Sequence, residues 1–236
     1  MSQQIFYCLD KDRAEIALDD GKANTMDLGF FAELEAALDR AEEDGAKSVL
    51  FYGRERFFSA GLNLDTVNAL TAEELPEFGS AFARAMLKVW GFAIPTVAAT
   101  TGHAIAGGAI LAFACDRRVA LDGPYKIQMN ESRNRMSLPT WAIEVCQSAI
   151  PRQLWTRALL HADVFTPREA ASSGLFDECV AEGGDVVARG REIAESYRGI
   201  HLRSYAVSKR RLRGERIDQA LSLIDTEHRR GGVPSR

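Results

Sequence analysis

FFSAGLNLD (57–65) and AIAGGAILAFACD (104–116) decide how this chain folds and which chemistry it can carry. Each places small residues where a buried strand must turn sharply. Gly61 permits a turn that a β-carbon would obstruct, so the next N–H group, that of Leu62, can point into a cavity. Gly107 and Gly108 open a helix, whose first N–H groups have no internal partner and carry partial positive charge. Two such N–H groups facing one point would form an oxyanion hole for an anion made from a carbonyl.

Short apolar stretches predict the strands. IFYCLD (5–10) and AEIALD (14–19) alternate apolar and polar residues across a charged turn, which predicts a β-hairpin. Further strands are expected at 48–53, 96–101, 117–121, 126–129 and 175–181. Because strands recur with helices between them in the first two-thirds of the chain, we expect an α/β fold.

Capping residues and apolar spacing predict the helices. From Asp27, apolar residues recur at helical spacing until Gly45. Other helices are expected from a capping box of Thr71 and Glu74 to about Trp90, after Gly108, after Pro139, after Pro151, from Thr166 with Glu169 to Gly174, and from 185 onward with breaks near Gly199 and Gly214. Helices dominate the last third, so we expect a core over 1–184 and a helical region over 185–236.

The composition argues against several classes of protein. The chain has 236 residues and a net charge of −4, whereas a nucleic-acid-binding surface would be basic. The sequence contains no signal peptide and no apolar run that could span a bilayer, so we expect a cytoplasmic protein without a membrane partner. The cysteines lack C-x-x-C spacing and the histidines are scattered, so we expect reduced thiols and no metal site.

The basic run KRRLRGER (209–216) stands out near the C-terminus. It favours a solvated helix face, with a contact to phosphate or to a neighbouring subunit as the alternative.

Three segments together carry a family resemblance. FFSAGLNLD, PTVAATTGHAIAGGAILAFACDRRVAL (95–121) and the NE of MNESRNRMSLP (129–139) resemble the crotonase superfamily, also called the enoyl-CoA hydratase/isomerase family. The similarity covers nearly the whole chain. It implies a crotonase-type spiral of ββα turns with a helical C-terminal trimerisation region, and a homotrimer or dimer of trimers. It also implies an acyl-CoA thioester as substrate, with coenzyme A as part of that substrate and no separate cofactor.

The resemblance also implies the residues of the site. By motif position, the N–H groups of Leu62 and Gly107 would hold the thioester oxygen. The residues expected to contact the substrate are Ala23, Ala60, Gly61, Asn63, Leu64, Ile105, Gly108, Ile110, Arg135 and Pro139. Lys22, Arg54 and Arg56 are candidates for contacts to the coenzyme A phosphates.

The carboxylates favour one reaction of this family. A hydratase in it typically uses two glutamates, and here Ile110 occupies the first position while Glu131 matches the second. One carboxylate is enough to carry a proton between two carbons. The setting of Glu131, with Pro139 and Trp141, is similar to delta-3,delta-2-enoyl-CoA isomerases. We therefore expect Glu131 to be the acid/base, with a pKa raised by an apolar pocket that includes Ile110.

The neighbourhood of Glu131 also departs from the family pattern. Relatives with this layout often carry glycine where this chain has Gln128 and Arg135. Arg135 could form an ion pair that lowers the pKa of Glu131, recognise a carboxylate on the acyl group, or lie in solvent. We also expect an arginine at 135 to remove access to left-handed backbone angles. Two alternatives stay open: hydration or thioester hydrolysis, and a non-catalytic acyl-CoA-binding protein.

Other polar residues near the glycine pair have structural interpretations. His103 is expected to be a hydrogen-bonded residue of the turn before Gly107. Asp116 and Arg117 are expected to form a structural pair where the helix passes into a strand.

Overall fold

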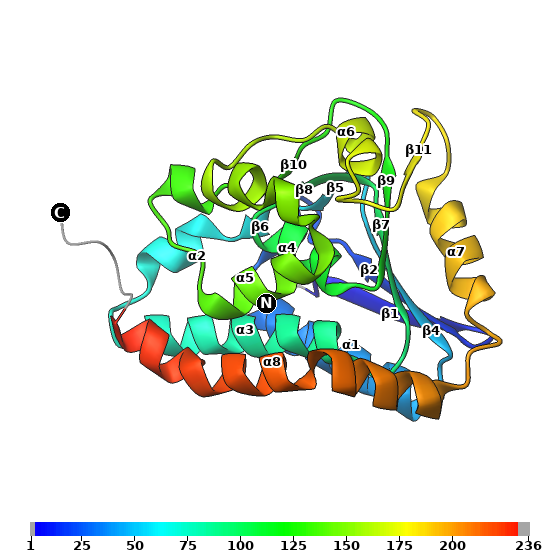
Figure 1. Cartoon of the computed structure of the whole chain (residues 1–236), viewed down its shortest axis with the longest axis horizontal. Helices are drawn as coiled ribbons and strands as arrows, with labels where there is room; N and C mark the ends of the chain where they lie inside the picture. Colours follow the sequence, from blue (N-terminus) through cyan, green and yellow to red (C-terminus); the bar gives the residue numbers. More distant parts are fainter. Residues whose placement is uncertain (1–2, 231–236) are drawn as a thin grey trace.

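The main sheet of the structure has six strands, and the helices pack against its two faces (Figure 1). A computed structural model describes residues 3–230, with side chains over residues 3–224. The strand order is β1 (Ile5–Asp10), β2 (Arg13–Leu18), β4 (Ser48–Gly53), β7 (Thr96–Thr100), β9 (Arg117–Leu121) and β11 (Glu178–Val180). β1 and β2 form the predicted antiparallel hairpin, and every later neighbour in the order is parallel. The sheet therefore grows by crossover connections, as an α/β fold requires.

The two faces of this sheet pack against different layers. Successive strand residues point to opposite faces. Phe51 and Ala98 belong to the larger core, whereas Leu50, Val97 and Ala99 belong to a smaller one. The smaller core is closed by α7 (Val186–Ser196), which lies alone on its side of the sheet in Figure 1.

The larger core lies under the remaining helices. These are α1 (Leu28–Glu43), α2 (Leu64–Ala69), α3 (Leu75–Gly91), α4 (Gly107–Ala114), α5 (Thr140–Ala149), α6 (Pro167–Ser172) and α8 (Leu202–Arg230). A 3-10 segment, Arg152–Leu154, and a π-helix, Thr156–Leu160, form the predicted helical stretch after Pro151. Asp27 caps α1 by accepting from the N–H of Phe30 at 2.9 Å. Within residues 3–230, no helix combines the length and apolar character needed to cross a bilayer.

Two small sheets carry the glycine-rich stretches. The first has the order β10 (Ile127–Gln128), β8 (Gly102–Ile105) and β5 (Arg56–Ser59), all parallel. The second pairs β3 (Thr25–Met26) with β6 (Gly61–Leu62), also in parallel. His103 therefore lies in a strand, and the expectation that it sits on a turn was wrong.

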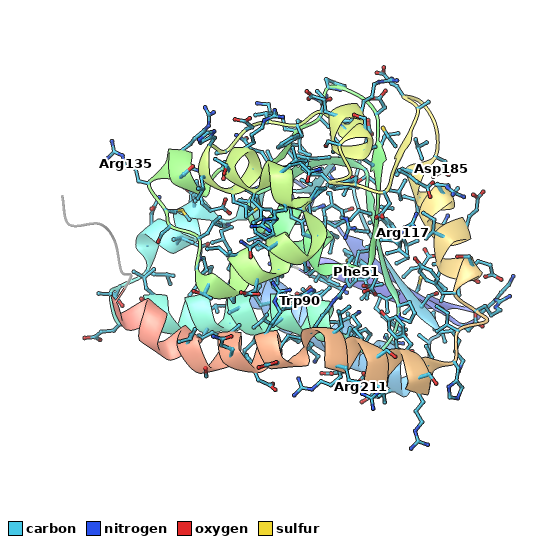
Figure 2. All side chains as sticks on the ribbon, in the orientation of Figure 1. Phe51, Trp90, Arg117, Arg135, Asp185 and Arg211 are labelled. Carbon is cyan, nitrogen blue, oxygen red and sulfur yellow. The ribbon has the colours of Figure 1, made fainter. Side chains whose placement is uncertain are left out.

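The helix α8 runs beside α3 along one edge of the molecule in Figure 1. One side of its basic run packs against the rest of the chain, where Lys209 and Arg213 both bond to Asp116, at 2.9 and 3.1 Å. Arg216 bonds to Glu144 of α5. Arg211, labelled in Figure 2, is exposed. Arg210 and Glu215 are exposed as well, so the run has the predicted solvated face on one side and charges that attach α8 to its own chain on the other.

Several other boundaries differ from the predictions. α8 continues through Gly214, whereas the break near Gly199 is present between α7 and α8. Thr71 and Glu74 make the reciprocal bonds of a capping box, but the helix starts at Leu75. The strand expected over 175–181 is limited to β11, and α2 was not predicted. Short elements such as these are fixed by their neighbours rather than by local periodicity.

Candidate active site

The turn before α4 has an unusual backbone. Ala106 has φ 49° and ψ −120°, a backbone conformation that residues other than glycine rarely adopt. Such a conformation costs about 1–3 kcal/mol and persists only where neighbours enforce it. Here the Ala106 N–H donates to the carbonyl of Gln128 at 2.8 Å, and the Ala106 carbonyl accepts from Ile110 at 2.9 Å. The turn thus leaves the N–H groups of Gly107 and Gly108 at the open N-terminus of α4.

The structure brings the two glycine-rich stretches into direct contact. A β-carbon on Gly61 would lie 2.8 Å from the Ile105 carbonyl oxygen and 3.0 Å from the Gly107 nitrogen. A β-carbon on Gly108 would lie 2.3 Å from the carbonyl oxygen of Ser59. Gly61 also has φ +86°. The close approach of the two backbones therefore requires glycine at both positions.

Strand β6 directs the N–H group of Leu62. The next N–H, that of Asn63, donates to the carbonyl of Met26 in β3 at 2.9 Å. Successive N–H groups of a strand point to opposite sides. The N–H of Leu62 therefore points away from β3, and the adjacent Gly61 lies against Gly107.

The parallel pairing of β8 and β10 places Glu131 at the same edge as Gly107. Gln128 is the register partner of Ile105, two residues before Gly107. Glu131 follows Gln128 by three residues and opens the 3-10 turn η1 (Glu131–Asn134). Because the strands run in the same direction, the residues that follow them emerge together.

One oxygen of the buried Glu131 carboxyl group has no hydrogen-bond partner among the described residues. The residue is 8% exposed, and within the described part of the chain its Oε2 has no hydrogen bond. Burial raises the pKa of Glu131 from its ordinary 4.5 to about 7, and a bond from its own backbone N–H lowers it slightly against that trend. The predicted upward shift of this pKa is confirmed. A carboxyl group with such a pKa can both accept and return a proton near neutral pH.

An apolar wall surrounds the glycine turn. A β-carbon on Gly107 would lie 3.1 Å from the sulfur of Met26 and 3.2 Å from Cζ of Phe82. Phe82 in turn meets the Trp141 ring edge to face, with the ring centroids 4.9 Å apart. Ile110 on α4 is buried. Sequence reasoning missed Met26 and Phe82, although the helical spacing of Phe78 and Phe82 marked that face of α3 as buried.

The other residues predicted to contact the substrate differ in burial and in hydrogen bonding. Ala23 accepts from the N–H of Ala60 at 2.9 Å, which ties the loop before β3 to the first stretch. Asn63 caps α2 by accepting from Thr66 at 3.1 Å. Leu64 is exposed, Ile105 ends β8, and Pro139 precedes the first residue of α5. Lys22 and Arg54 lie together, because Arg54 donates to the Lys22 carbonyl at 2.7 Å, while Arg56 is exposed.

Arg135 points away from the site. Its side chain is exposed and extends from the edge of the molecule in Figure 2. Within the described residues it forms no ion pair with Glu131, so that possibility was wrong. Arg135 also has φ 59° and ψ 28°, so arginine adopts the left-handed conformation that it was expected to exclude. Its solvated position leaves Glu131 in an uncharged environment.

Asp116 and Arg117 do not pair with each other. Asp116 accepts from Tyr205, Lys209 and Arg213 of α8, at 2.6, 2.9 and 3.1 Å. Arg117 instead bonds to Glu178 at 3.2 Å. Their roles are structural as expected, but their partners come from distant segments.

Comparison with known proteins places the chain in a family. The sequence model of the enoyl-CoA hydratase/isomerase family matches residues 11–222, so the chain belongs to this family. It is 30% identical to human mitochondrial enoyl-CoA delta isomerase 1 over 162 residues, which are 67% of this chain and 54% of that protein. It is 27% identical to a probable enoyl-CoA hydratase of Bacillus subtilis over 202 residues, 82% of this chain and 75% of that one.

A solved structure confirms the crotonase-type fold. Human mitochondrial delta3-delta2-enoyl-CoA isomerase superposes with a TM-score of 0.92, over 97% of this chain and 90% of that chain, at 24% identity. The relatives carry both isomerase and hydratase names. The family therefore establishes an enzyme of enoyl-CoA chemistry, and the residues of the site must indicate the reaction.

Proposed function

We propose that this protein is an enoyl-CoA isomerase that converts 3-enoyl-CoA to 2-enoyl-CoA with Glu131 as its one acid/base. The observation that carries the proposal is the buried carboxyl group of Glu131, whose Oε2 has no hydrogen-bond partner among the described residues and whose pKa burial raises to about 7. It lies at the same strand edge as the open N-terminus of α4.

The mechanism follows from these groups. The N–H groups of Leu62 and Gly107 polarise the thioester carbonyl, which makes the C2 proton acidic. Glu131 removes that proton, and the electrons form a dienolate whose oxygen the two N–H groups stabilise. The protonated carboxyl then delivers the same proton to C4, and the double bond moves to C2–C3. Each N–H donor is worth about 10²–10³ in rate, and the positioned carboxyl about 10²–10⁴.

The surroundings of Glu131 support isomerisation over water addition. A hydratase needs a second group that positions and activates water. At the position where such a glutamate is typical, the structure holds the buried side chain of Ile110. Within the described residues, no carboxylate or histidine hydrogen-bonds to Glu131. The non-catalytic alternative depended on the SRNR loop (132–135) disabling Glu131, and the side chains of this loop, Arg135 included, are exposed.

A spectroscopic assay tests the proposal. The purified chain is incubated with 3-hexenoyl-CoA, and the ultraviolet absorbance of the conjugated 2-enoyl thioester is followed beside a Glu131→Gln variant. We expect absorbance to grow with the native chain, and the rate of this increase to be about 10²–10⁴-fold lower with the variant. The same chain with 2-hexenoyl-CoA tests hydration, which would appear as loss of absorbance. Hydration without isomerisation would contradict the proposal.

The resemblance that implies the reaction also implies a homotrimer or a dimer of trimers. Light scattering on the purified chain measures its molar mass, and a monomer at micromolar concentration would contradict this assembly.

A further inference from the structure

Strand β10, which leads to Glu131, is held from both sides. On one side, the carbonyl of Gln128 accepts from Ala106 at 2.8 Å, at the strained turn before Gly107. On the other side, Ile127 and Phe165 exchange two backbone hydrogen bonds, at 2.9 and 3.0 Å. The segment before Phe165 therefore runs beside the turn that carries Glu131.

Two side chains join this segment to that turn through a single oxygen atom. Gln128 Nε2 donates to the carbonyl of Ala162 at 2.8 Å, and Arg133 Nε donates to the same carbonyl at 3.2 Å. Arg133 Nη2 also reaches the carbonyl of His161 at 3.4 Å. Gln128 precedes Glu131 by three residues and Arg133 follows it by two, so the two bonds flank the carboxylate.

The shared acceptor is itself fixed. Ala162 is fully buried and has φ 53°, a left-handed conformation that is costly for a residue with a β-carbon. Such a conformation persists where several contacts determine it together. The carbonyl of Ala162 is therefore an anchored point, and donors bound to it lose freedom of movement.

We propose that Gln128 and Arg133 are positioning residues that hold the η1 turn through the carbonyl of Ala162, and so keep the Glu131 carboxyl buried at the edge where Gly107 lies. This inference rests on the proposed function, in which Glu131 carries the proton. Gln128 is one of the positions where this chain departs from the glycine often found in relatives.

Loosening this attachment would have two consequences. A displacement of the carboxyl by about 1 Å can cost about 10²-fold in rate, because the reacting atoms must be aligned. Water admitted to the turn would also lower the pKa of Glu131, because burial is what raises it. The titratable group that faces Glu131 from α5 is the thiol of Cys146, whose own pKa is raised by burial and then by the charge of Glu131.

The test compares variants that remove each donor. Gln128→Met keeps the length of the side chain and removes its N–H groups, and Arg133→Ala removes the other donor. Because both donors bind one oxygen, each can partly replace the other. We expect kcat to fall about fivefold in each single variant and by more than about 50-fold in the double variant, with KM changed by less than about threefold. Arg133→Lys, which retains a donor, should stay within about twofold of the native kcat.

Asn134→Ala is the matched control. Asn134 lies on the same turn with an exposed side chain, and it makes no side-chain hydrogen bond within the described residues. A double variant with native kcat, or a loss in Asn134→Ala equal to that in the double variant, would overturn the proposal. Binding of hexanoyl-CoA, a saturated thioester, shows that each variant retains a folded site.

A second measurement separates this inference from the proposed function. The carboxyl carbon of Glu131, labelled with ¹³C and assigned with Glu131→Gln, is titrated by NMR in the native chain and the double variant. We expect a midpoint near 7 in the native chain and a clearly lower one in the double variant. An unchanged midpoint would refute the positioning role. If the native chain binds hexanoyl-CoA but isomerises nothing, the proposed function fails, and this titration still decides whether the two residues keep Glu131 buried.

Discussion

At the scale of single residues, the burial that raises the pKa of Glu131 suits it to proton transfer and also lowers the stability of the protein. A carboxyl group whose pKa is higher in the folded than in the unfolded chain binds its proton more tightly when folded. The contribution of Glu131 to stability is therefore fully present below about pH 4.5 and is lost as the pH rises to about 7. The full difference is up to about 3 kcal/mol. Above about pH 7 the protein thus holds an ionised carboxylate in a buried environment that destabilises its charged form.

The variant Glu131→Gln should consequently be more stable than the native chain. Glutamine carries no charge at any pH, so the free energy of unfolding should increase by up to about 3 kcal/mol at pH 8. At pH 5 the increase should be less than about 1 kcal/mol, because the native carboxyl is then protonated in the folded state. Urea unfolding at both pH values measures this. An equal gain at both would show that the charge is not the cause, and Glu73→Gln, at an exposed position, is the control.

Gly108 illustrates a steric requirement of a single residue. An added β-carbon would lie 2.3 Å from the Ser59 carbonyl oxygen, so Gly108→Ala must separate the two stretches of the site. We expect a loss of at least about 3 kcal/mol in the free energy of unfolding, or failure to fold. Gly199→Ala is the control, since nothing lies within 4 Å of its added β-carbon. Comparable thermal unfolding of the two variants would contradict the close approach.

At the scale of elements, one buried carboxylate, that of Asp116, binds three side chains of α8. Asp116 follows α4 and also accepts from the N–H and hydroxyl of Thr96, at 2.9 and 3.0 Å. Burial alone would raise the pKa of Asp116, but Lys209 and Arg213 hold it below its ordinary value. Lys209 is itself buried. A charge network of this kind is costly to break because it leaves buried cations without a counter-charge.

Removing that carboxylate should therefore destabilise the protein strongly. We expect Asp116→Ala to lower the free energy of unfolding by about 3–5 kcal/mol, measured by urea unfolding. Adding Lys209→Met should recover part of the loss, because it removes one of the unpaired buried cations. Arg211→Ala, at an exposed position of the same helix, should change stability by less than about 0.5 kcal/mol. A mild effect of Asp116→Ala would mean that apolar packing alone holds α8.

At the scale of the whole molecule, the two terminal helices complete the two cores. α7 covers Leu50, Val97 and Val119 on one face of the main sheet. On the opposite side, α8 contributes Ile217, Ala220 and Ile224 to the larger core. The expected boundary near residue 185 thus separates a mixed α/β segment from a helical one, and both segments contribute to the same two cores.

A chain shortened to residues 1–184 should not fold by itself. It would expose the apolar face under α7 and the side of α3 under α8, and such surfaces lead to association. We expect aggregation in size-exclusion chromatography and no cooperative thermal transition. A monodisperse fragment with cooperative unfolding would show that the first 184 residues are an independent domain.

Local patterns of the sequence determined most of the elements and the chemistry of the site. Apolar spacing and capping residues specify α1, β4, β7, α4 and α6, because these signals act within a few residues. Gly61 and Gly107 mark sharp turns. Each of these depends on chemistry that neighbouring residues carry themselves.

Tertiary structure alone decided which distant residues meet. Three features join separated segments: the pairing of Asp116 with α8, the wall of Met26 and Phe82, and the contacts of Gln128 and Arg133 with Ala162. The exposure of Arg135 likewise depends on where the folded chain places its turn. Their residue types were visible in the sequence, but a charge or a donor does not specify its partner. The partner is set by the direction in which the folded backbone places each side chain, which emerges only when the sheets and helices have packed.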